Sequence, residues 1–157
     1  LLRRAKEAGV GTLVETAGAV GWEQLWAALE EADIVYFDLK FASSELHKRY
    51  TGMDNALILD NLRNTSARKE NLVVRIPLIP GINDAPEELG RMAELICRLP
   101  HVSRIGLLPY HRYGVKKYAL LGRDYALEQV PVQAEHSVAQ ARDLLARATG
   151  REVRSGI

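Results

Sequence analysis

Four short apolar runs, each ending in polar or charged residues, constrain the fold of this chain more than any other feature. The runs are Thr12–Thr16, Ile34–Lys40, Leu72–Pro80 and Ile105–His111. Between them, apolar residues recur with the spacing of amphipathic helices. Short β-branched runs that alternate with helices are typical of a parallel sheet with covered faces. The order therefore predicts an α/β fold with a barrel-like parallel sheet and outer helices.

The expected second strand, Asp33–Lys40, indicates which face of the sheet the helices cover. Successive residues of a strand point to opposite faces. We expect the apolar set beneath the outer helices and the polar set on the inner face of the barrel. The apolar set is Val35, Phe37 and Leu39, and the polar set is Tyr36, Asp38 and Lys40.

Capping residues and periodicity place the other elements. Helices are expected to begin near residues 1, 22, 43, 55, 84 and 134, and residues 111–125 are expected to form a polar loop. Four or five strands cannot close a complete eight-stranded barrel, so residues 1–157 are expected to form one domain with a partial barrel. The remaining strands are expected at Gly11–Thr16, Asn71–Ile79, Arg104–Tyr110 and Glu152–Arg154.

Composition and charge exclude several classes of function. Of the 157 residues, 47% are hydrophobic and 26% charged, as in soluble globular proteins. The 21 basic and 20 acidic residues give a net charge of +1, which indicates neither nucleic acid nor a membrane surface as a partner. No apolar run approaches the roughly 18–20 residues that span a bilayer. The single cysteine, Cys97, excludes an internal disulfide or a self-contained cysteine cluster and favours a cytoplasmic protein.

The first residues, Leu1–Gly9, have the pattern of an amphipathic helix that ends at a glycine, and not that of a signal peptide. No initiator methionine and no capping sequence precede this helix. We therefore expect the chain to be a fragment of a longer protein.

Charged residues that end the apolar runs are expected to meet. In barrels and open α/β sheets the ligand binds where the strands end. The sequence therefore predicts a binding site for a charged ligand at one mouth of the barrel. The side chains expected there are Glu15, Asp38, Lys40, Arg75 and His111.

The charges of Asp38 and Lys40 have two interpretations. Charges on the inner face of an apolar strand are costly to bury without partners. In the first, the two side chains form a structural ion pair with each other. In the second, Lys40 binds a ligand carboxylate while Asp38 binds a cation or an amine. Arg75 likewise requires an anionic partner, which is either a ligand carboxylate or a neighbouring Glu or Asp.

Glu15 and Thr16 also have two interpretations. Glu15 is expected beside Asp38, and two carboxylates that approach each other require a positive group between them. Oxygen atoms of Glu15, Thr16 and Asp38 suit a hard cation. The alternative is an ordinary helix-capping turn.

A structural role is the simplest interpretation for the cysteine, the other histidines and a basic segment. Cys97 is expected to face the core or its boundary. The basic segment between residues 112 and 125 is a solvated loop, or a contact surface for a protein partner or an anionic part of the ligand. Its basic residues are Arg112, Lys116, Lys117 and Arg123. The histidines expected on helical or loop surfaces are His47, His101 and His136.

Several segments, taken in order, resemble one known family. The segments are Glu15–Gly18 (ETAG), Tyr36–Lys40 (YFDLK), Tyr50–Asn55 (YTGMDN), Asn61-Leu62, Val74–Gly81 (VRIPLIPG), Asn83-Asp84, Leu107–His111 (LLPYH) and Lys117–Tyr125. The chain resembles the later two-thirds of a glycyl-radical-enzyme activating protein, the group that contains the pyruvate formate-lyase activating enzyme. The ordered set covers nearly the whole chain.

This resemblance implies a radical S-adenosylmethionine (SAM) enzyme, an oxidoreductase built on a partial (β/α)6 barrel. In that family a reduced [4Fe–4S] cluster donates an electron to S-adenosylmethionine and cleaves a carbon–sulfur bond. The resulting 5′-deoxyadenosyl radical abstracts hydrogen from a backbone glycine of a partner glycyl-radical enzyme. The resemblance also implies a flavodoxin- or ferredoxin-type reductant.

The resemblance further assigns roles to individual residues. Lys40 matches a lysine close to the methionyl carboxylate of the cofactor. Arg75 matches a strand arginine near the ribose and the methionyl part, and His111 matches a histidine that contacts the cofactor from the final strands. The positions that match the ligands of a monovalent cation beside that carboxylate are Glu15, Thr16 and Asp38.

Two departures from the family pattern matter. The family's Cys-x3-Cys-x2-Cys cluster motif and its Gly-Gly-Glu segment are absent, and we expect both upstream of Leu1, so that this fragment alone is inactive. Glu15 stands where the pyruvate formate-lyase activator has aspartate, and Tyr36 where it has methionine. The partner enzyme therefore stays open between a formate-lyase, a diol or glycerol dehydratase and another glycyl-radical enzyme.

Two rival functions fit the same residues. The first is a self-contained barrel lyase or aldolase that uses Lys40 as a Schiff-base amine. The second is a non-catalytic module that docks a glycyl-radical enzyme through the loops at the rim of the barrel.

Overall fold

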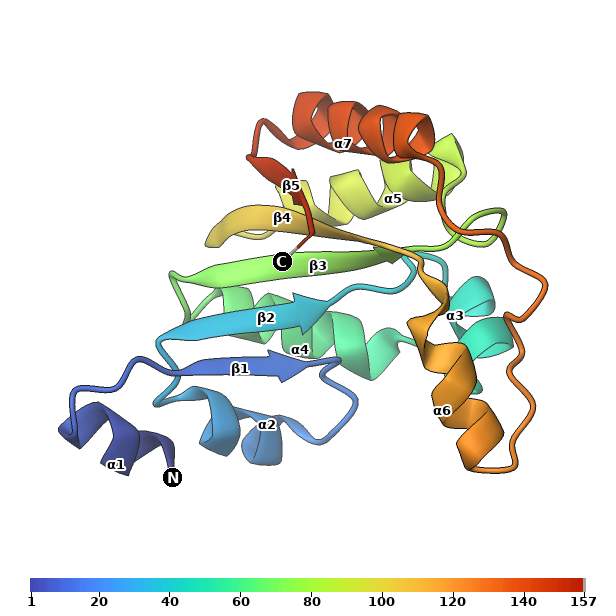
Figure 1. Ribbon diagram of the computed structural model, residues 1–157. Coiled ribbons are helices and arrows are strands. Elements are labelled where there is room, and N and C mark those ends of the chain that lie inside the picture. Colours follow the sequence, from blue (N-terminus) through green and yellow to red (C-terminus); the bar gives the residue numbers. More distant parts are fainter. Residues whose placement is uncertain (157) are drawn as a thin grey trace.

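The computed structural model describes residues 1–156 and contains one sheet of five parallel strands (Figure 1). The strands lie side by side in chain order, and each pairs in parallel with the next. Within the described residues β1 and β5 do not pair with each other, so the sheet is not a closed barrel. The predicted α/β fold is confirmed. The strands are β1 (Leu13–Thr16), β2 (Ile34–Asp38), β3 (Leu72–Leu78), β4 (Val102–Pro109) and β5 (Val153–Ser155).

Helices connect the strands, and most begin where the sequence predicts. Only α6 and the short 3-10 turn before it were not expected, because residues 111–125 were predicted to be a loop. None of the residues of α6 is buried, so no buried face marks this helix in the sequence. None of the helices in the described residues combines the length and apolar character that a bilayer crossing requires. The helices are α1 (Leu2–Glu7), α2 (Trp22–Leu29), α3 (Ser44–Thr51), α4 (Ala56–Ser66), α5 (Pro86–Cys97), the 3-10 turn η1 (Arg112–Gly114), α6 (Val115–Leu120) and α7 (Glu135–Thr149).

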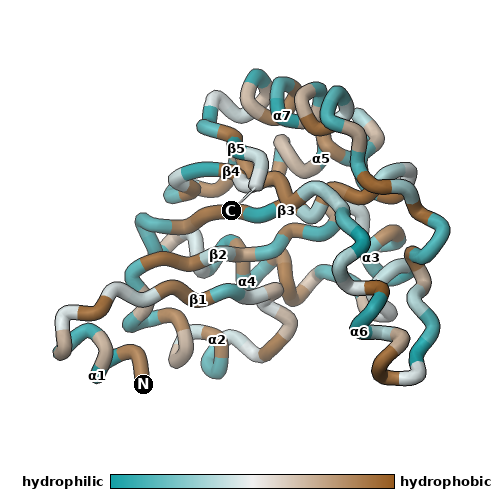
Figure 2. The backbone as a smooth tube through the Cα atoms, in the orientation of Figure 1, coloured by the Kyte–Doolittle hydropathy of each residue, from teal (hydrophilic) through white to brown (hydrophobic). Residues whose placement is uncertain are grey.

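The core lies between one face of the sheet and helices α2, α4, α5 and α7 (Figure 1). Val35, Phe37 and Leu39 are buried there, as the alternation in β2 predicts. Figure 2 shows hydrophobic stretches along the central strands and mixed colours on the surrounding helices. The opposite face of β2 carries the polar set, which is half-buried. The sheet therefore separates an apolar outer layer from a polar inner face.

A buried carboxylate ties α5 to the loop that follows β2. Glu88 is 1% exposed, and its Oε1 accepts hydrogen bonds from the backbone N–H groups of Ala42 at 2.6 Å and Ser43 at 3.1 Å. Arg91 donates to its other oxygen from Nε at 2.9 Å and Nη2 at 2.7 Å. The charge is thus compensated, and the loop between β2 and α3 is fixed against the outer layer.

Three buried asparagine side chains hold the loops at the carboxyl ends of the strands. Asn61 donates to the carbonyls of Gly18 and Val20, both at 2.8 Å, in the loop after β1. Asn55 donates to Phe41 at 3.0 Å after β2. A third, Asn83, donates to the carbonyls of Lys40 at 3.0 Å and Pro77 at 2.6 Å. Each amide replaces water at carbonyls that the ladder leaves unpaired, so the loop backbones are positioned rather than free.

The loop after β1 also depends on one glycine. Gly18 has a φ of +67°, and a Cβ added there would lie 2.2 Å from Cζ of the Phe37 ring. Only glycine fits both the left-handed backbone and the close approach of that ring. The Gly18 of the ETAG segment is therefore explained by packing.

Two expectations about single residues were wrong. His47 was expected on a surface, but it is 3% exposed, and its Nδ1 lies 2.8 Å from the Met53 carbonyl oxygen and 2.9 Å from Thr51 Oγ1. Cys97 was expected to face the core or its boundary, but it is exposed, with Sγ 3.4 Å from the Ala148 carbonyl oxygen. His101 and His136 are exposed as predicted.

The hydrogen bonds of Glu88 predict that this one carboxylate has a large effect on stability. Replacing Glu88 by alanine leaves two buried N–H groups without their acceptor, and we expect a loss of about 2–4 kcal/mol in the free energy of unfolding. Glu87→Ala, one residue earlier on the exposed side of α5, is the matched control and should stay within about 0.5 kcal/mol of the wild type. Urea denaturation measures the free energy of unfolding of both variants. Equal losses in the two variants would contradict a special role for the Glu88 hydrogen bonds.

Candidate active site

Four charged side chains meet on the inner face, at the carboxyl ends of β1 and β2 and beside the middle of β3. Arg75 Nη1 lies 2.9 Å from Glu15 Oε1, and Arg75 Nη2 lies 2.9 Å from Asp38 Oδ1. Lys40 Nζ donates to Asp38 Oδ2 at 3.2 Å. We call these four residues the mouth cluster. The predicted convergence of Glu15, Asp38, Lys40 and Arg75 is confirmed.

The strand register explains the convergence. Asp38 in β2 pairs with Arg75 in β3, so their side chains leave the sheet on the same face. Glu15 in β1 pairs with Tyr36 in β2, which belongs to that face as well. Paired residues of neighbouring parallel strands lie close enough for long side chains to meet. The alternation and register together therefore bring the charges into contact.

Arg75 is the most buried member, with a side chain 9% exposed. Burial by itself would lower the pKa of its guanidinium, but hydrogen bonds with Glu15 and Asp38 outweigh burial and raise the pKa above its ordinary value. The guanidinium also lies over the ring of Tyr36, 5.2 Å from its centroid. Arg75 is thus a fixed cation held by two carboxylates and an aromatic face.

The positive group between Glu15 and Asp38 is this guanidinium. The mouth cluster has no net charge, because its two carboxylates are balanced by the cations of Lys40 and Arg75. Both structural interpretations made from the sequence, the Asp38–Lys40 ion pair and the Arg75 salt bridge, describe its contacts. A ligand would therefore enter a site whose charges are already balanced.

Thr16 lies apart from the mouth cluster. It pairs in register with Phe37, a core residue, so its side chain leaves the strand on the other face from Glu15. Its hydroxyl accepts a hydrogen bond from the Gly18 N–H at 3.0 Å, which closes a local turn. This turn does not cap a helix as the alternative supposed, because α2 begins at Trp22 and its N-cap is Gly21. Across residues 1–156 no three His, Cys, Asp or Glu side chains are grouped to hold a metal ion. A cation held by Glu15, Thr16 and Asp38 stays a prediction.

His111 lies just beyond the end of β4, at the same edge of the sheet. Its Nδ1 accepts a hydrogen bond from the Tyr113 N–H at 3.3 Å, and the two rings lie 4.3 Å apart. No hydrogen bond or ion pair within residues 1–156 joins His111 to the mouth cluster. It is exposed, and its predicted role in cofactor binding is untested by these contacts.

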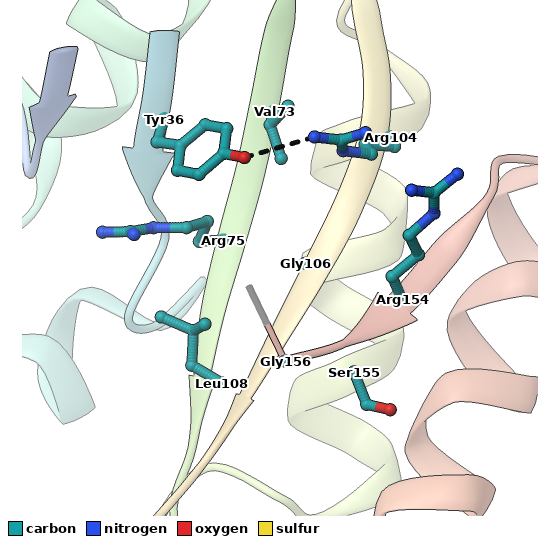
Figure 3. A pocket seen from close by; sticks show the side chains of 9 residues that line it. All are labelled: Tyr36, Val73, Arg75, Arg104, Gly106, Leu108, Arg154, Ser155 and Gly156. Carbon is teal, nitrogen blue, oxygen red and sulfur yellow. Dashed lines mark hydrogen bonds between the residues drawn. The ribbon is translucent and has the colours of Figure 1, made fainter. Parts of the chain in front are cut away.

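Tyr36 connects the mouth cluster with an arginine that the sequence interpretation missed. Arg104 Nη2 donates to the Tyr36 hydroxyl at 3.2 Å, as Figure 3 shows. Arg104 and Gly106 alternate with the core residues Ile105 and Leu107 along β4. The same alternation that was used for β2 would have placed Arg104 on the inner face.

A hollow lined by aromatic side chains lies at the mouth beside Lys40, and we call it the aromatic hollow. It has a volume of about 410 Å³, and its lining includes Phe41, Tyr50, Tyr118 and Tyr125. Phe41 and Tyr50 stack with ring centroids 5.5 Å apart. Burial, with the hydroxyl of Tyr110 and the charge of Tyr118 nearby, raises the pKa of Tyr125 to about 12.

Comparison with known proteins points to one group of enzymes. The isethionate sulfite-lyase activating enzyme of Oleidesulfovibrio alaskensis is 40% identical over 132 residues, which are 83% of this chain and 42% of that protein. The crystal structure of a domain of pyruvate-formate lyase-activating enzyme from Bacteroides vulgatus matches with a TM-score of 0.80 and 25% identity, over 99% of this chain and 87% of that one. The homologues of this chain are glycyl-radical-enzyme activating enzymes.

This homology confirms the resemblance found in the sequence, and the fold agrees. A radical SAM methyltransferase from Sphaerobacter thermophilus matches with a TM-score of 0.68 at 16% identity, over 95% of this chain and 42% of that one, which is a likeness of fold alone. The sequence matches none of the protein-family models with which it was compared. The chain spans 42% to 59% of the length of the curated relatives it matches.

The environment of Tyr125 predicts a measurable titration. A folded-state pKa of about 12 lies above the ordinary value of about 10, so the neutral phenol stabilises the fold below about pH 10 and that contribution is lost as the pH rises toward 12. The difference in tyrosinate absorbance between wild type and Tyr125→Phe should titrate near pH 12 in the folded protein and near pH 10 in denaturant. A single transition near pH 10 in both states would contradict this environment.

Proposed function

We propose that this chain is the S-adenosylmethionine-binding part of a radical SAM activating enzyme that generates a glycyl radical on a partner enzyme. The observation that carries the proposal is the mouth cluster. It sits at the strand ends of a chain homologous to such activating enzymes. The [4Fe–4S] cluster would be held by cysteines outside these 157 residues, because Cys97 is the only cysteine present.

The donor set of the mouth cluster suits the methionyl end of that cofactor. An amino-acid group carries one carboxylate and one ammonium, and the mouth cluster offers both signs of charge. Lys40 and Arg75 are the groups for the carboxylate, and Glu15 and Asp38 are the groups for the ammonium. Since a zwitterion adds no net charge, it can exchange partners with the cluster without leaving a buried charge uncompensated.

The exposures of the four side chains support this division of roles. Glu15 and Lys40 are 52% and 35% exposed, so each can turn toward a ligand. Arg75 and Asp38 are 9% and 20% exposed and hold each other, so they form the fixed floor of the site. A ligand that lies across this floor is oriented by groups that need not reorganise.

When bound, the cofactor would supply the radical chemistry, with an electron from a flavodoxin- or ferredoxin-type protein. The chain's own contribution is to hold the cofactor still and to limit access of water. The aromatic hollow beside Lys40 offers apolar surface to a polypeptide at the mouth, where the glycine-bearing segment of the partner must arrive. A monovalent cation at Glu15 and Asp38 would have to share their oxygens with Arg75.

The rival aldolase function is less consistent with the site. A Schiff-base lysine reacts as a neutral amine and is usually activated by an apolar pocket or a second cation. Lys40 instead lies 3.2 Å from the carboxylate of Asp38 and is 35% exposed. Failure to trap Lys40 with borohydride and a panel of carbonyl compounds is therefore expected.

Binding of the cofactor is the first test of the proposal. We expect S-adenosylmethionine to bind the chain saturably in isothermal titration calorimetry, and Lys40→Gln and Arg75→Lys each to weaken binding about tenfold or more. Lys48→Gln, on the exposed side of α3, is the matched control. Unchanged affinity in both cluster variants, with their thermal unfolding preserved, would overturn the assignment of the site.

Radical formation is the second test. The chain can replace its aligned 132-residue segment in the isethionate sulfite-lyase activating enzyme of Oleidesulfovibrio alaskensis. We expect the chimera, once its cluster is reconstituted, to produce a glycyl radical detectable by electron paramagnetic resonance on that enzyme's own partner. Lys40→Gln in the chimera should reduce the radical yield at least tenfold. A chimera with an intact cluster and bound cofactor that forms no radical would count against the proposed reaction.

A further inference from the structure

Three arginines line one hollow on the inner face, set back from the mouth cluster. Arg75 reaches it from β3, Arg104 from β4 and Arg154 from β5, with Tyr36 and Gly106 between them (Figure 3). The hollow has a volume of about 100 Å³, and no acidic residue lines it. We call it the arginine hollow. Cations on neighbouring strands repel each other, so this grouping requires a compensating partner.

The protein compensates these three charges unequally. Arg75 is matched by Glu15 and Asp38. Within residues 1–156, Arg154 forms an ion pair only through Nε, 2.7 Å from a carboxylate oxygen of Glu152, which does not line the hollow.

Arg104 has no carboxylate partner among residues 1–156. Within this range its one side-chain hydrogen bond is to the Tyr36 hydroxyl. Each guanidinium has five N–H donors, so most donors of Arg104 and Arg154 have no acceptor in the described residues.

The strand register aims these donors at one place. Gly106 pairs with Arg154, and Arg104 precedes Gly106 by two residues on the same face. Figure 3 shows the Arg104 guanidinium directed at the Tyr36 hydroxyl, with Arg154 rising from the neighbouring strand β5. Both side chains line the same hollow, and the planar fork of a guanidinium matches the geometry of an oxyanion, which accepts bidentate hydrogen bonds.

The size of the hollow limits the ligand. The hollow is small, at about 100 Å³, and therefore suits a small oxyanion better than a large ligand. The absence of a side chain at Gly106 keeps it open. A Cβ there would lie 3.5 Å from Arg75 Cγ, which is an ordinary contact, so glycine is not required by packing. A larger side chain would fill the space that the ligand needs.

We propose that the arginine hollow is a binding site for a small oxyanion of the phosphate or sulfate type, held by Arg104 and Arg154. Tyr36 joins it to the mouth cluster, because its hydroxyl accepts from Arg104 while its ring faces Arg75. Arg75 belongs to both sites, but Arg104 and Arg154, the two groups proposed to hold the oxyanion, are not among the groups assigned to the cofactor carboxylate. The oxyanion site does not depend on the proposed function.

Calorimetric titration of the 157-residue chain with inorganic phosphate, at ionic strength held constant with sodium chloride, tests the proposal. We expect one saturable site, about tenfold weaker binding in Arg104→Gln and weaker binding in Arg154→Gln. Gly106→Val should abolish binding by filling the hollow. Lys40→Gln should leave phosphate affinity unchanged, which separates this site from the cofactor site. Arg142→Gln, an exposed α7 residue paired with Asp143, is the matched control.

Sulfate and acetate identify the chemistry of the ligand. Competition by sulfate with weak or no competition by acetate supports a tetrahedral oxyanion, and stronger binding of acetate would overturn that class. Phosphate binding that is unsaturable, or unchanged in Arg104→Gln and Arg154→Gln, would overturn the site itself. These two arginines are partly or largely exposed, so their variants should fold, and a failure of Gly106→Val to fold would leave the test intact.

Discussion

The contact of one buried guanidinium with two carboxylates governs the inner face of this protein. Arg75 comes from β3, and its partners Glu15 and Asp38 come from β1 and β2. Removing either carboxylate would leave a largely buried cation undercompensated, which is costly. The contact therefore ties three strands together at the edge where a ligand must enter. Because a register slip of one residue would turn Arg75 into the core, the same contact also opposes slippage.

The outer layer of helices stabilises the fold, and the strand ends carry the candidate site. The helices bury the apolar sides of the strands, while Glu88 and three asparagine amides hold the loops that follow them. Buried Leu39 and Phe41 anchor the loop after β2, and these side-chain hydrogen bonds fix the loop carbonyls that the sheet leaves unpaired. A mouth with fixed loops can present Lys40 and Glu15 to a ligand without first ordering the backbone.

Charge balance connects the two sites on the inner face. The mouth cluster is neutral as it stands, which fits the zwitterion that we propose it binds, whereas the arginine hollow retains a positive excess at Arg104, which fits the proposed anion. Tyr36 lies between them and contacts an arginine of each. A thioether in the place of the Tyr36 hydroxyl would be only a weak acceptor for the Arg104 hydrogen bond.

The sequence by itself determined the parallel α/β fold, strand boundaries within two residues, and the inner-face positions of Asp38, Lys40 and Arg75. Periodicity and burial carry that information locally. Tertiary structure decided which partners those charges have, because Glu15 and Arg75 lie 60 positions apart in sequence and meet only through strand register. It also buried His47, exposed Cys97 and made α6 a helix without a buried face. No hydrogen bond or ion pair among the described residues joins His111 to the mouth cluster. Each of these features depends on how segments that are distant in sequence pack against one another, and a local pattern of residues does not contain that information.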